Sequence, residues 1–271
     1  LPPIVTIFHG HDVGTAHQTG EVGQYQNLFR LGSRHLPVNA RFREILIANG
    51  APVERTHVHH MGIDVAAIPF ERRDWTLRPL QILSVARLTE KKGISSALMA
   101  LAKVRGQRPE LSWRYNIVGE GELREDLGVL SAELGLTDSV DFLGARPHAE
   151  VRLLLAKTQL FLLPSVTAGN GDVEGIPVSL MEAMASGAIV VSSIHSGIPE
   201  LVEDGVSGLL APERDVDTLA MKLLATADHP DSMDAMAWNA RQTVESEFNA
   251  TVQMERLETE LIATLDEIQA S

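Results

Sequence analysis

The 271-residue sequence contains no cysteine, which excludes disulfides, thiolate metal sites and cysteine nucleophiles. A chain without disulfides is typical of a reducing compartment, so we expect a cytoplasmic protein. The sequence has no apolar run close to the roughly 18 residues that a membrane-spanning helix needs. No basic segment followed by an apolar one opens the chain, so no signal peptide is visible.

An excess of positive charge is also absent. The chain carries 23 basic and 36 acidic side chains, which gives a net charge of −13. General nucleic-acid binding needs a basic surface, so we expect no nucleic-acid partner. Much of the acid lies near the end, where residues 201–271 hold 4 basic and 15 acidic side chains. The first 200 residues are close to neutral and can still meet an anionic small substrate.

The chain has no initiator methionine and opens on an apolar, strand-like segment at residues 4–8. We therefore expect that an upstream segment is missing. Helical patterns follow at residues 24–31 and 40–49, and two prolines with a cluster of charges at residues 68–79 predict a linker.

From residue 80 onward, apolar strand-like runs alternate with helical segments. The six runs lie at residues 80–86, 115–118, 140–143, 160–163, 188–191 and 208–210. Apolar strands between helices predict an α/β fold with a Rossmann-like, doubly wound parallel sheet. The ligand crevice of such a sheet lies beyond the carboxyl ends of its strands. The loops that should meet there are 87–93, 119–121, 143–147, 164–177 and 192–199.

The most informative segment is residues 172–187, in which a helix follows Pro177. Proline at a helix start costs no hydrogen bond, and the free N–H groups from Gly175 onward form a site for an anion. Glu174 and Glu182 flank this helix start. Carboxylates beside a phosphate site make sense if they accept hydrogen bonds from hydroxyls, as a nucleotide sugar would offer. Taken alone, the pattern still favours two solvated glutamates at a helix start, and the motifs that follow shift the balance to the nucleotide sugar.

Two cations follow the first strand of the sheet at a matching position. Arg87 and Lys92 lie on either side of a turn before the next helix, where both can contact phosphate oxygens. Gly119-Glu120-Gly121 follows the next strand and predicts a tight turn. We predict that the Arg87 guanidinium, the Lys92 ammonium and the peptide nitrogens after Glu174 surround one cavity.

Four motifs in this order resemble the nucleotide-sugar domain of retaining GT-B glycosyltransferases of family 4, also called group 1. These motifs are Arg87 with Lys92-Gly93, Val118-Gly119-Glu120-Gly121, residues 174–182, and Ser196-Gly197-Ile198-Pro199-Glu200. The resemblance covers residues 80–211. Residues 6–10 and 61–64 resemble parts of the first domain of that fold. Residues 167–174, with the Met- and Ala-rich helix that follows and His195-Ser196-Gly197, resemble bacterial exopolysaccharide-assembly members.

The resemblance implies a GT-B domain organisation with an incomplete first domain. Residues 1–68 would be the last part of the N-terminal, acceptor-binding Rossmann-like domain, and residues 69–79 the interdomain linker. Residues 80–250 would form the nucleotide-sugar domain, and residues 251–271 a helix that returns toward the first domain. An apolar stripe in that helix (Leu257, Leu261, Leu265 and Ile268) predicts core packing.

The resemblance also implies a role for each candidate residue. Arg87 and Lys92 would bind the diphosphate and stabilise the leaving group, beside the Gly119 turn and the helix start at Pro177. Glu182 would hold the ribose, and Leu143 to Ala145 would border the base. Glu174, with the amides of Gly175 and Ile176, would hold the donor sugar, and His9 would lie near the transferred sugar and the acceptor.

The implied reaction moves a sugar from a nucleoside diphosphate, UDP or GDP, to a hydroxyl of a saccharide or lipid-linked saccharide with retention. No cofactor or metal is expected, because protein cations face the leaving group. Asp215-Val216-Asp217 has the spacing of a metal-binding motif but opens a helix and is expected to cap it. A lipid-linked acceptor implies peripheral membrane contact, to which Arg30, Arg34, Arg41 and Arg43 are the candidate contributors.

Two alternatives share the same crevice. One is a GT-B nucleotide-sugar epimerase, which needs acid and base carboxylates and no acceptor. The other is a catalytically inactive nucleotide-sugar-binding protein. A dinucleotide-dependent oxidoreductase is disfavoured, because no G-x-G-x-x-G follows the opening strand of either region.

Overall fold

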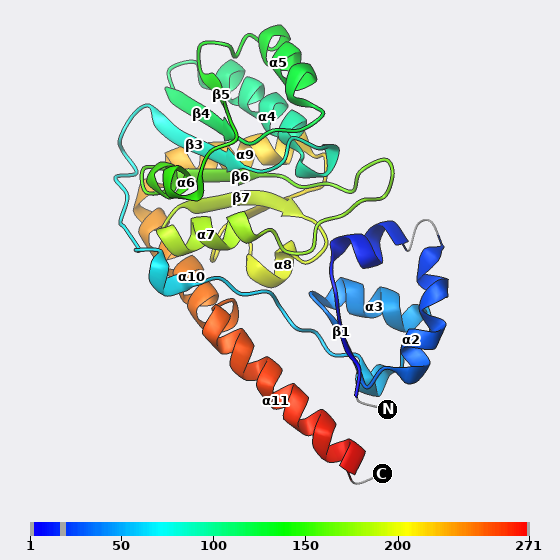
Figure 1. Ribbon diagram of the computed structural model, residues 1–271. Coiled ribbons are helices and arrows are strands. Elements are labelled where there is room, and N and C mark those ends of the chain that lie inside the picture. Colours follow the sequence, from blue (N-terminus) through cyan, green and yellow to red (C-terminus); the bar gives the residue numbers. More distant parts are fainter. Residues whose placement is uncertain (1–2, 17–19, 270–271) are drawn as a thin grey trace.

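The computed structural model describes residues 3–16 and 20–269 and consists of a larger and a smaller α/β region (Figure 1). The larger region is built on a six-stranded sheet in which every pair of neighbouring strands is parallel. Its strands are β3 (Leu80–Val85), β4 (Trp113–Val118), β5 (Val140–Gly144), β6 (Leu160–Leu163), β7 (Ile189–Ile194) and β8 (Leu209–Pro212). The strand order β5-β4-β3-β6-β7-β8 is the doubly wound order, which confirms the predicted fold class.

Helices cover both faces of this sheet. The helices on one face are α4 (Ile94–Gln107), α5 (Arg124–Glu133) and α9 (Val216–Asp228). The helices on the other face are α6 (His148–Leu155), α7 (Val178–Ser186) and α10 (Pro230–Glu247). A short helix, α8 (Ile198–Leu201), follows β7. The strands are nearly continuously buried, as a sheet covered on both faces requires.

The smaller region contains a two-stranded parallel sheet of β1 (Val5–Phe8) and β2 (Arg34–Pro37). Helices α2 (Gln26–Leu31) and α3 (Ala40–Ala48) pack beside it, with the short turns η1 (His11–Thr15), η2 (Glu21–Tyr25) and η3 (Val53–Arg55). Its apolar core contains Phe8, Phe29, Phe42 and Leu46. The sequence pattern did not predict β2, which begins with two polar residues.

The segment that joins the two regions has extended and turn conformation after a short turn η4 (Val65–Ala67). Arg73 fixes it to the larger region, because its guanidinium donates to the carbonyl oxygens of Leu155, Thr158 and Ser186. Ile63, Val65 and Ile68 also pack into the core of the larger region. The larger region therefore holds the connection firmly.

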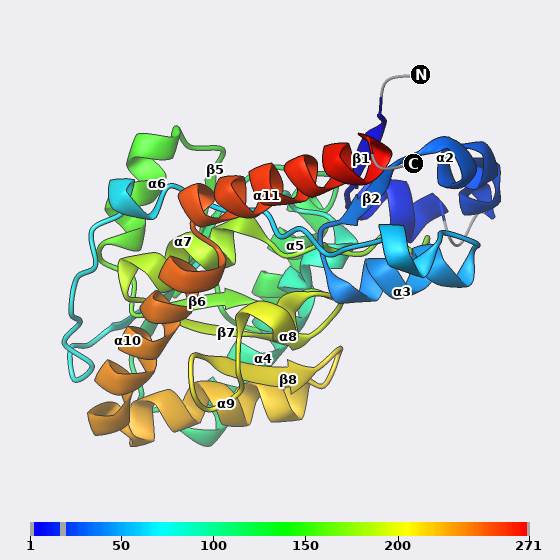
Figure 2. The same ribbon diagram turned by 90° about the horizontal axis from the view of Figure 1, so that it is seen from below.

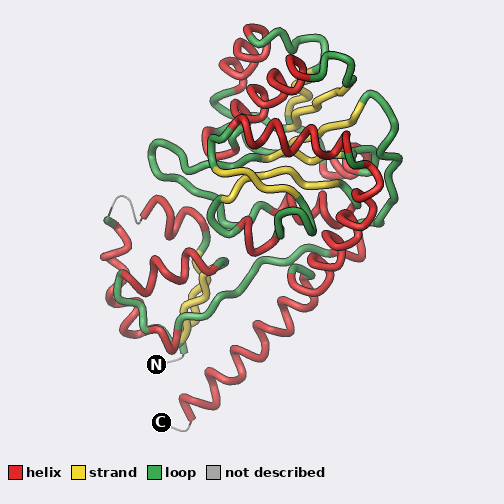
Figure 3. The backbone as a smooth tube through the Cα atoms, turned by 180° about the vertical axis from the view of Figure 1, so that it is seen from behind, coloured by secondary structure: helices red, strands yellow, loops and turns green. Residues whose placement is uncertain are grey.

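The last helix, α11 (Ala250–Gln269), leaves the larger region and runs alongside β1 and β2 (Figures 2 and 3). Its polar side faces inward: Glu260 and Glu267 pair with the buried guanidinium of Arg34, at 2.6 Å in both cases. The predicted core packing of its apolar stripe is wrong, because Leu261 and Leu265 are exposed and Thr264 is buried instead. The side chain of Ile268 lies outside the described residues.

Candidate functional site

Five loops meet at the carboxyl ends of the strands, as predicted. The N–H of Leu88 donates to the carbonyl of Glu120 at 2.8 Å, and the N–H of Gly119 donates to that of Gly144 at 2.9 Å. On the other side of β3, the N–H of Val166 donates to the carbonyl of Lys91 at 2.9 Å. The gap between β3 and β6 is where the strand order reverses, which is the usual ligand position in this kind of sheet.

Two glycines allow these loops to approach each other. Gly93 has φ +65°, and a Cβ there would lie 1.9 Å from the carbonyl oxygen of Pro164. Gly119 has φ +134°, and a Cβ there would lie 1.8 Å from the carbonyl oxygen of Ala86. A side chain at either position would force the loops apart. Gly119 therefore contacts the β3 loop in this structure, and its predicted place beside the diphosphate stays a prediction.

A cluster of ion pairs lies at the centre of the site. The Lys92 ammonium is 2.9 Å from Glu174 Oε2, and the Lys91 ammonium is 3.4 Å from Glu174 Oε1. Lys91 also pairs with Asp172 at 3.0 Å. Glu174 is buried, and its Oε1 has no hydrogen-bond donor in the described part of the chain. Sequence reasoning found Lys92 and Glu174 but missed Lys91 and Asp172.

Arg87 lies on one side of this cluster. Its side chain is exposed and lines a hollow of about 260 Å³ together with Lys91, Asn170 and Asp172. This hollow opens directly beyond β3, so both cations can reach a negatively charged ligand in it.

A second hollow, of about 220 Å³, lies on the other side of Glu174. His9, Gly175 and Ile176 line it, with Val38, Met61 and Val178. Helix α7 starts here without a side-chain cap. Within the described residues, no protein group accepts from the N–H groups of Gly175 or Ile176. The predicted free helix start is thus present, and His9 of the smaller region faces it.

The structure corrects the prediction of a single cavity. Arg87 and Gly175 line two different hollows, and Lys92 lines neither of them. The ion pairs of Glu174 connect the two, because Lys91 lines the first hollow and Gly175 follows Glu174 in the second.

Glu182 lies away from both hollows. Its carboxylate oxygen Oε1 is 2.9 Å from His148 Nε2, at the start of α6. This places Glu182 near the end of β5, which contains Leu143, and the loop after it, which contains the exposed Ala145. His148 is a polar group that sequence reasoning did not single out.

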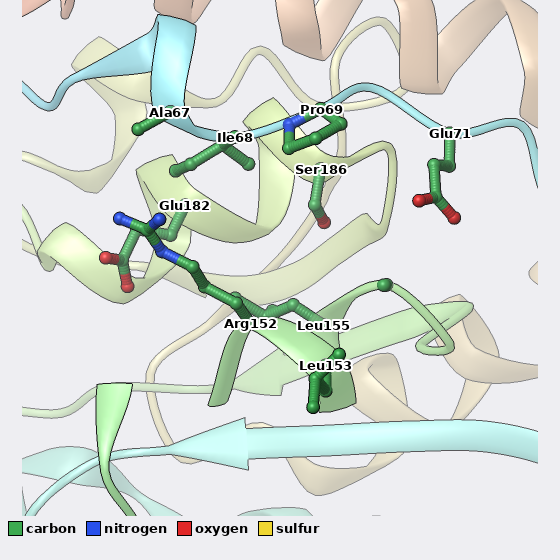
Figure 4. Close-up of a pocket in the computed structure, with 10 residues that line it drawn as sticks. Ala67, Ile68, Pro69, Glu71, Arg152, Leu153, Leu155, Glu182 and Ser186 are labelled. Carbon is green, nitrogen blue, oxygen red and sulfur yellow. The ribbon is translucent and has the colours of Figure 1, made fainter. Parts of the chain in front are cut away.

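Glu182 also borders a hollow of about 200 Å³ between helices α6 and α7 and the segment that connects the two regions. Residues 67–69 of the connecting segment, Arg152, Leu155 and Ser186 line it. Figure 4 shows the Arg152 guanidinium lying beside the Glu182 carboxylate at its edge. No sequence motif indicated this hollow.

A further buried network holds the Glu174 loop from behind. His195, at the end of β7, accepts from the Glu174 N–H with Nε2 at 3.1 Å. Its Nδ1 is 2.6 Å from Glu213 Oε1, at the end of β8. Glu213 also accepts from the Thr167 N–H at 2.7 Å. Burial acts to raise the pKa of Glu213, but the hydrogen bonds from Thr167 and His195 outweigh it and leave this pKa lowered.

The four arginines proposed for membrane contact do not form a free basic surface. Arg34 is buried against Glu260 and Glu267, and Arg43 donates to the Thr56 carbonyl at 2.7 Å. Arg30 is 3.3 Å from Asn27 Oδ1, and only Arg41 is exposed without a described partner. The membrane-contact hypothesis therefore loses Arg34 and Arg43.

Among residues 3–16 and 20–269, no helix has the length and apolarity to cross a membrane. In the same part of the chain, no three histidine or acidic side chains are grouped so as to hold a metal. Asp215 caps α9 by accepting from the Thr218 N–H at 3.0 Å, which confirms its predicted role.

The chain matches the family described as glycosyl transferases group 1 over residues 68–243. It belongs to this family. It is 43% identical over 254 residues to the amylovoran biosynthesis glycosyltransferase AmsK of Erwinia amylovora, covering 93% of this chain and 62% of AmsK. It is 42% identical over 254 residues to the putative colanic acid biosynthesis glycosyltransferase WcaL of Escherichia coli K12, covering 92% and 61%. The chain thus spans less than two thirds of these relatives.

Solved structures show the same fold. Anabaena HepE in complex with UDP-glucose superposes with a TM-score of 0.81 at 25% identity, over 96% of this chain and 72% of HepE. Sucrose-phosphate synthase from Thermosynechococcus elongatus superposes with a TM-score of 0.78 at 20% identity, over 96% and 68%. The fold is the GT-B fold.

Proposed function

We propose that this chain is the donor-binding part of a retaining, metal-independent glycosyltransferase of bacterial exopolysaccharide assembly. It moves a hexose from a nucleoside diphosphate, with UDP favoured, to a hydroxyl of a saccharide or lipid-linked saccharide. The names of AmsK and WcaL support the polysaccharide, and the HepE complex with UDP-glucose supports the donor. Activity at the cytoplasmic face of a membrane belongs to the same proposal.

One observation carries the proposal. At the point where the strand order reverses, two lysines and an exposed arginine lie beside a helix start with unpaired N–H groups. A diphosphate needs such cations and N–H donors, and both kinds are present within one loop cluster.

Donor binding would rearrange the central ion pairs. The Lys92 ammonium now contacts Glu174, and a diphosphate offers it a stronger, doubly charged partner. When Lys92 turns to the phosphates, the Glu174 carboxylate becomes free to accept from sugar hydroxyls. The two hollows would then join into one donor site, with Glu182 and His148 toward the ribose and base.

In this proposal, each residue of the site has a separate role in the reaction. Arg87, Lys92 and the α7 start would stabilise the charge that develops on the bridging oxygen as the nucleoside diphosphate departs. Glu174 would orient the sugar, and His9 would border the anomeric carbon and the acceptor. The acceptor proton would pass to a phosphate oxygen on the same face, which gives retention without an enzyme nucleophile.

The test is transfer from UDP- and GDP-sugars in the presence of a chelator, followed by NMR of the anomeric proton of the product. Turnover that persists with chelator and gives the donor's own anomeric configuration is expected. An inverted product or a strict metal requirement would contradict the proposal.

The same experiment separates the alternatives. An epimerase would release a nucleotide sugar changed at its second carbon without any acceptor. A binding protein would retain UDP tightly and release no sugar. No contact in the structure favours either alternative over transfer.

A further inference from the structure

We propose that His195 and Glu213 are positioning residues that hold the donor-sugar carboxylate, Glu174, by its backbone. The inference rests on the proposed function, in which Glu174 contacts the sugar. His195 touches no part of either hollow, so its effect is transmitted through the Glu174 N–H.

Glu174 is held from two directions. Lys91 and Lys92, from the loop after β3, contact its side chain. His195, from the end of β7, accepts from its peptide N–H at 3.1 Å in a buried environment. The side-chain contacts are lost when the lysines turn to a diphosphate. The bond to His195 then remains as the fixed point that keeps the carboxylate in place.

Glu213 determines which nitrogen of His195 carries the proton. Nε2 accepts from the Glu174 N–H and therefore has a lone pair there. Nδ1 must then carry the proton, which it donates to the ionised Glu213 carboxylate at 2.6 Å. An acidic partner on one nitrogen fixes the opposite nitrogen as the acceptor. Without Glu213, the other tautomer would place an N–H against the Glu174 N–H.

Backbone strain marks the same two positions. In the described part of the chain, the non-glycine residues with positive φ are Ser196 at 48° and Arg214 at 62°. They directly follow His195 and Glu213. A left-handed conformation is unfavourable for a non-glycine residue, because its Cβ crowds the backbone. At both positions this unfavourable backbone conformation directs the preceding side chain, the His195 imidazole or the Glu213 carboxylate, toward its partner.

The network also continues to the phosphate side of the site. Arg214 donates to the Thr167 carbonyl at 2.7 Å and to Glu90 Oε1 at 3.0 Å. Glu90 precedes Lys91 and Lys92 in the same loop. The pair thus connects the loops after β3, β6, β7 and β8 behind Glu174.

The first test replaces His195 in the full chain. In His195→Gln, the side-chain oxygen can still accept from the Glu174 N–H, whereas His195→Leu fills the space without an acceptor. We expect the leucine variant to lower kcat for UDP-glucose hydrolysis by about 100-fold with little change in KM. The glutamine variant should recover most of kcat. Equal kcat values for leucine, glutamine and wild type would overturn the proposal.

A second test does not depend on turnover. Hydrogen exchange at the Glu174 amide should be about 5- to 10-fold faster in His195→Leu than in wild type or His195→Gln. Nitrogen-15 NMR of the wild-type imidazole should show a proton on Nδ1 and none on Nε2. A proton on Nε2, or unchanged exchange in the leucine variant, would overturn the proposal.

Glu213→Gln and Asp204→Asn form a matched pair, because Asp204 precedes β8 and Glu213 directly follows it. Asp204 accepts from the Leu210 N–H and from Lys222, much as Glu213 accepts from Thr167 and His195. Both variants should lose similar stability, and only Glu213→Gln should lower kcat. Equal kcat in both would overturn the role of Glu213.

The design distinguishes the two levels of inference. If no variant, wild type included, hydrolyses UDP-glucose or GDP-mannose while exchange and tautomer are as expected, the proposed function fails, and what stands is that His195 and Glu213 hold the Glu174 backbone. If wild type turns over and the variants match it, the positioning role fails alone.

Discussion

The two regions of this molecule differ in how they are held together. The larger region has one continuous apolar core that runs through all six strands and their helices. The core of the smaller region has ten buried residues, and one of them, Val173, belongs to the larger region. Arg34, at the start of β2, is buried and forms ion pairs with two glutamates of α11. The smaller region therefore depends on elements outside it, whereas the larger region contains the candidate cations Arg87, Lys91 and Lys92 within its own loops.

The largest expected effect compares one side chain in both cores. Phe161 on β6 and Phe42 on α3 are both fully buried. Phe161→Ala should cost about 3–5 kcal/mol of the stability of the whole chain. Phe42→Ala should lower the stability of the smaller region and leave amide protection of β3–β8 intact. Hydrogen exchange during denaturation checks this, and equal loss of protection in both regions would refute the asymmetry.

Glu174→Gln tests the loop that the two regions share. The neutral side chain keeps the shape but loses the charge that accepts from sugar hydroxyls. We expect kcat to fall about 100-fold, or roughly 2.7 kcal/mol, with UDP affinity nearly unchanged. Transfer kinetics and calorimetry with UDP measure the two effects. Parallel loss of UDP binding and turnover would contradict the sugar-binding role.

Arg87→Ala tests whether the larger region grips the diphosphate by itself. Loss of a charge-assisted contact should weaken UDP binding by about 1.5–3 kcal/mol and uridine binding much less. Arg114→Ala is the matched control, because Arg114 is a similarly exposed arginine near the opposite end of β4. Similar loss of UDP and uridine affinity in Arg87→Ala would remove the diphosphate assignment.

Arg34→Ala tests how the smaller region depends on α11. The change leaves Glu260 partly buried without its cation, so we expect a loss of about 1–3 kcal/mol. Arg108 also pairs with two carboxylates, Glu110 and Asp228, but in an exposed position. Arg108→Ala should therefore cost much less stability than Arg34→Ala, because solvent screens its ion pairs. Thermal unfolding of both variants gives the comparison, and equal losses would show that burial of Arg34 is unimportant.

The smallest expected effect is an acid-induced loosening of α11. Burial acts to raise the pKa of Glu260, but hydrogen bonds from Arg34 and His57 outweigh it and leave this pKa lowered. Ionised Glu260 therefore stabilises the folded state at pH values above its unfolded pKa of about 4.3. This stabilisation is lost as the pH falls through the pKa of Glu260 in the folded state. Exchange in α11 should accelerate there, before exchange in β3–β8. Glu260→Gln should remove this pH dependence, and its persistence in that variant would exclude Glu260 as the cause.

The sequence predicted the larger region well because local signals decide its elements. Apolar runs and glycine turns place all six strands to within a few residues. The helix start at Pro177 and its free amides follow from the same local chemistry. The elements that the sequence did not predict are determined by contacts between segments that are distant along the chain. Arg34 lies 226 residues from Glu260, so no local pattern shows that β2 is a buried strand.

Two further differences between the predictions and the structure also arise from contacts between distant segments. The periodicity of α11 correctly indicated a helix with an apolar stripe, but Arg34 and His57 determine which side faces inward. His195 and Glu213 become partners only because β7 and β8 are neighbours in the sheet. The sequence did not indicate that Lys92 forms an ion pair with Glu174, 82 residues away, and lines neither hollow.

Val173 and Glu174 are consecutive residues with anchors in different bodies. The Val173 side chain is embedded among the phenylalanines of the smaller region, and the Glu174 amide is tied to His195 of the larger one. The peptide unit between Val173 and Glu174 therefore joins the two regions directly. Any movement of one region against the other must therefore shift either the Val173 side chain or the Glu174 backbone, so this single peptide couples the two regions.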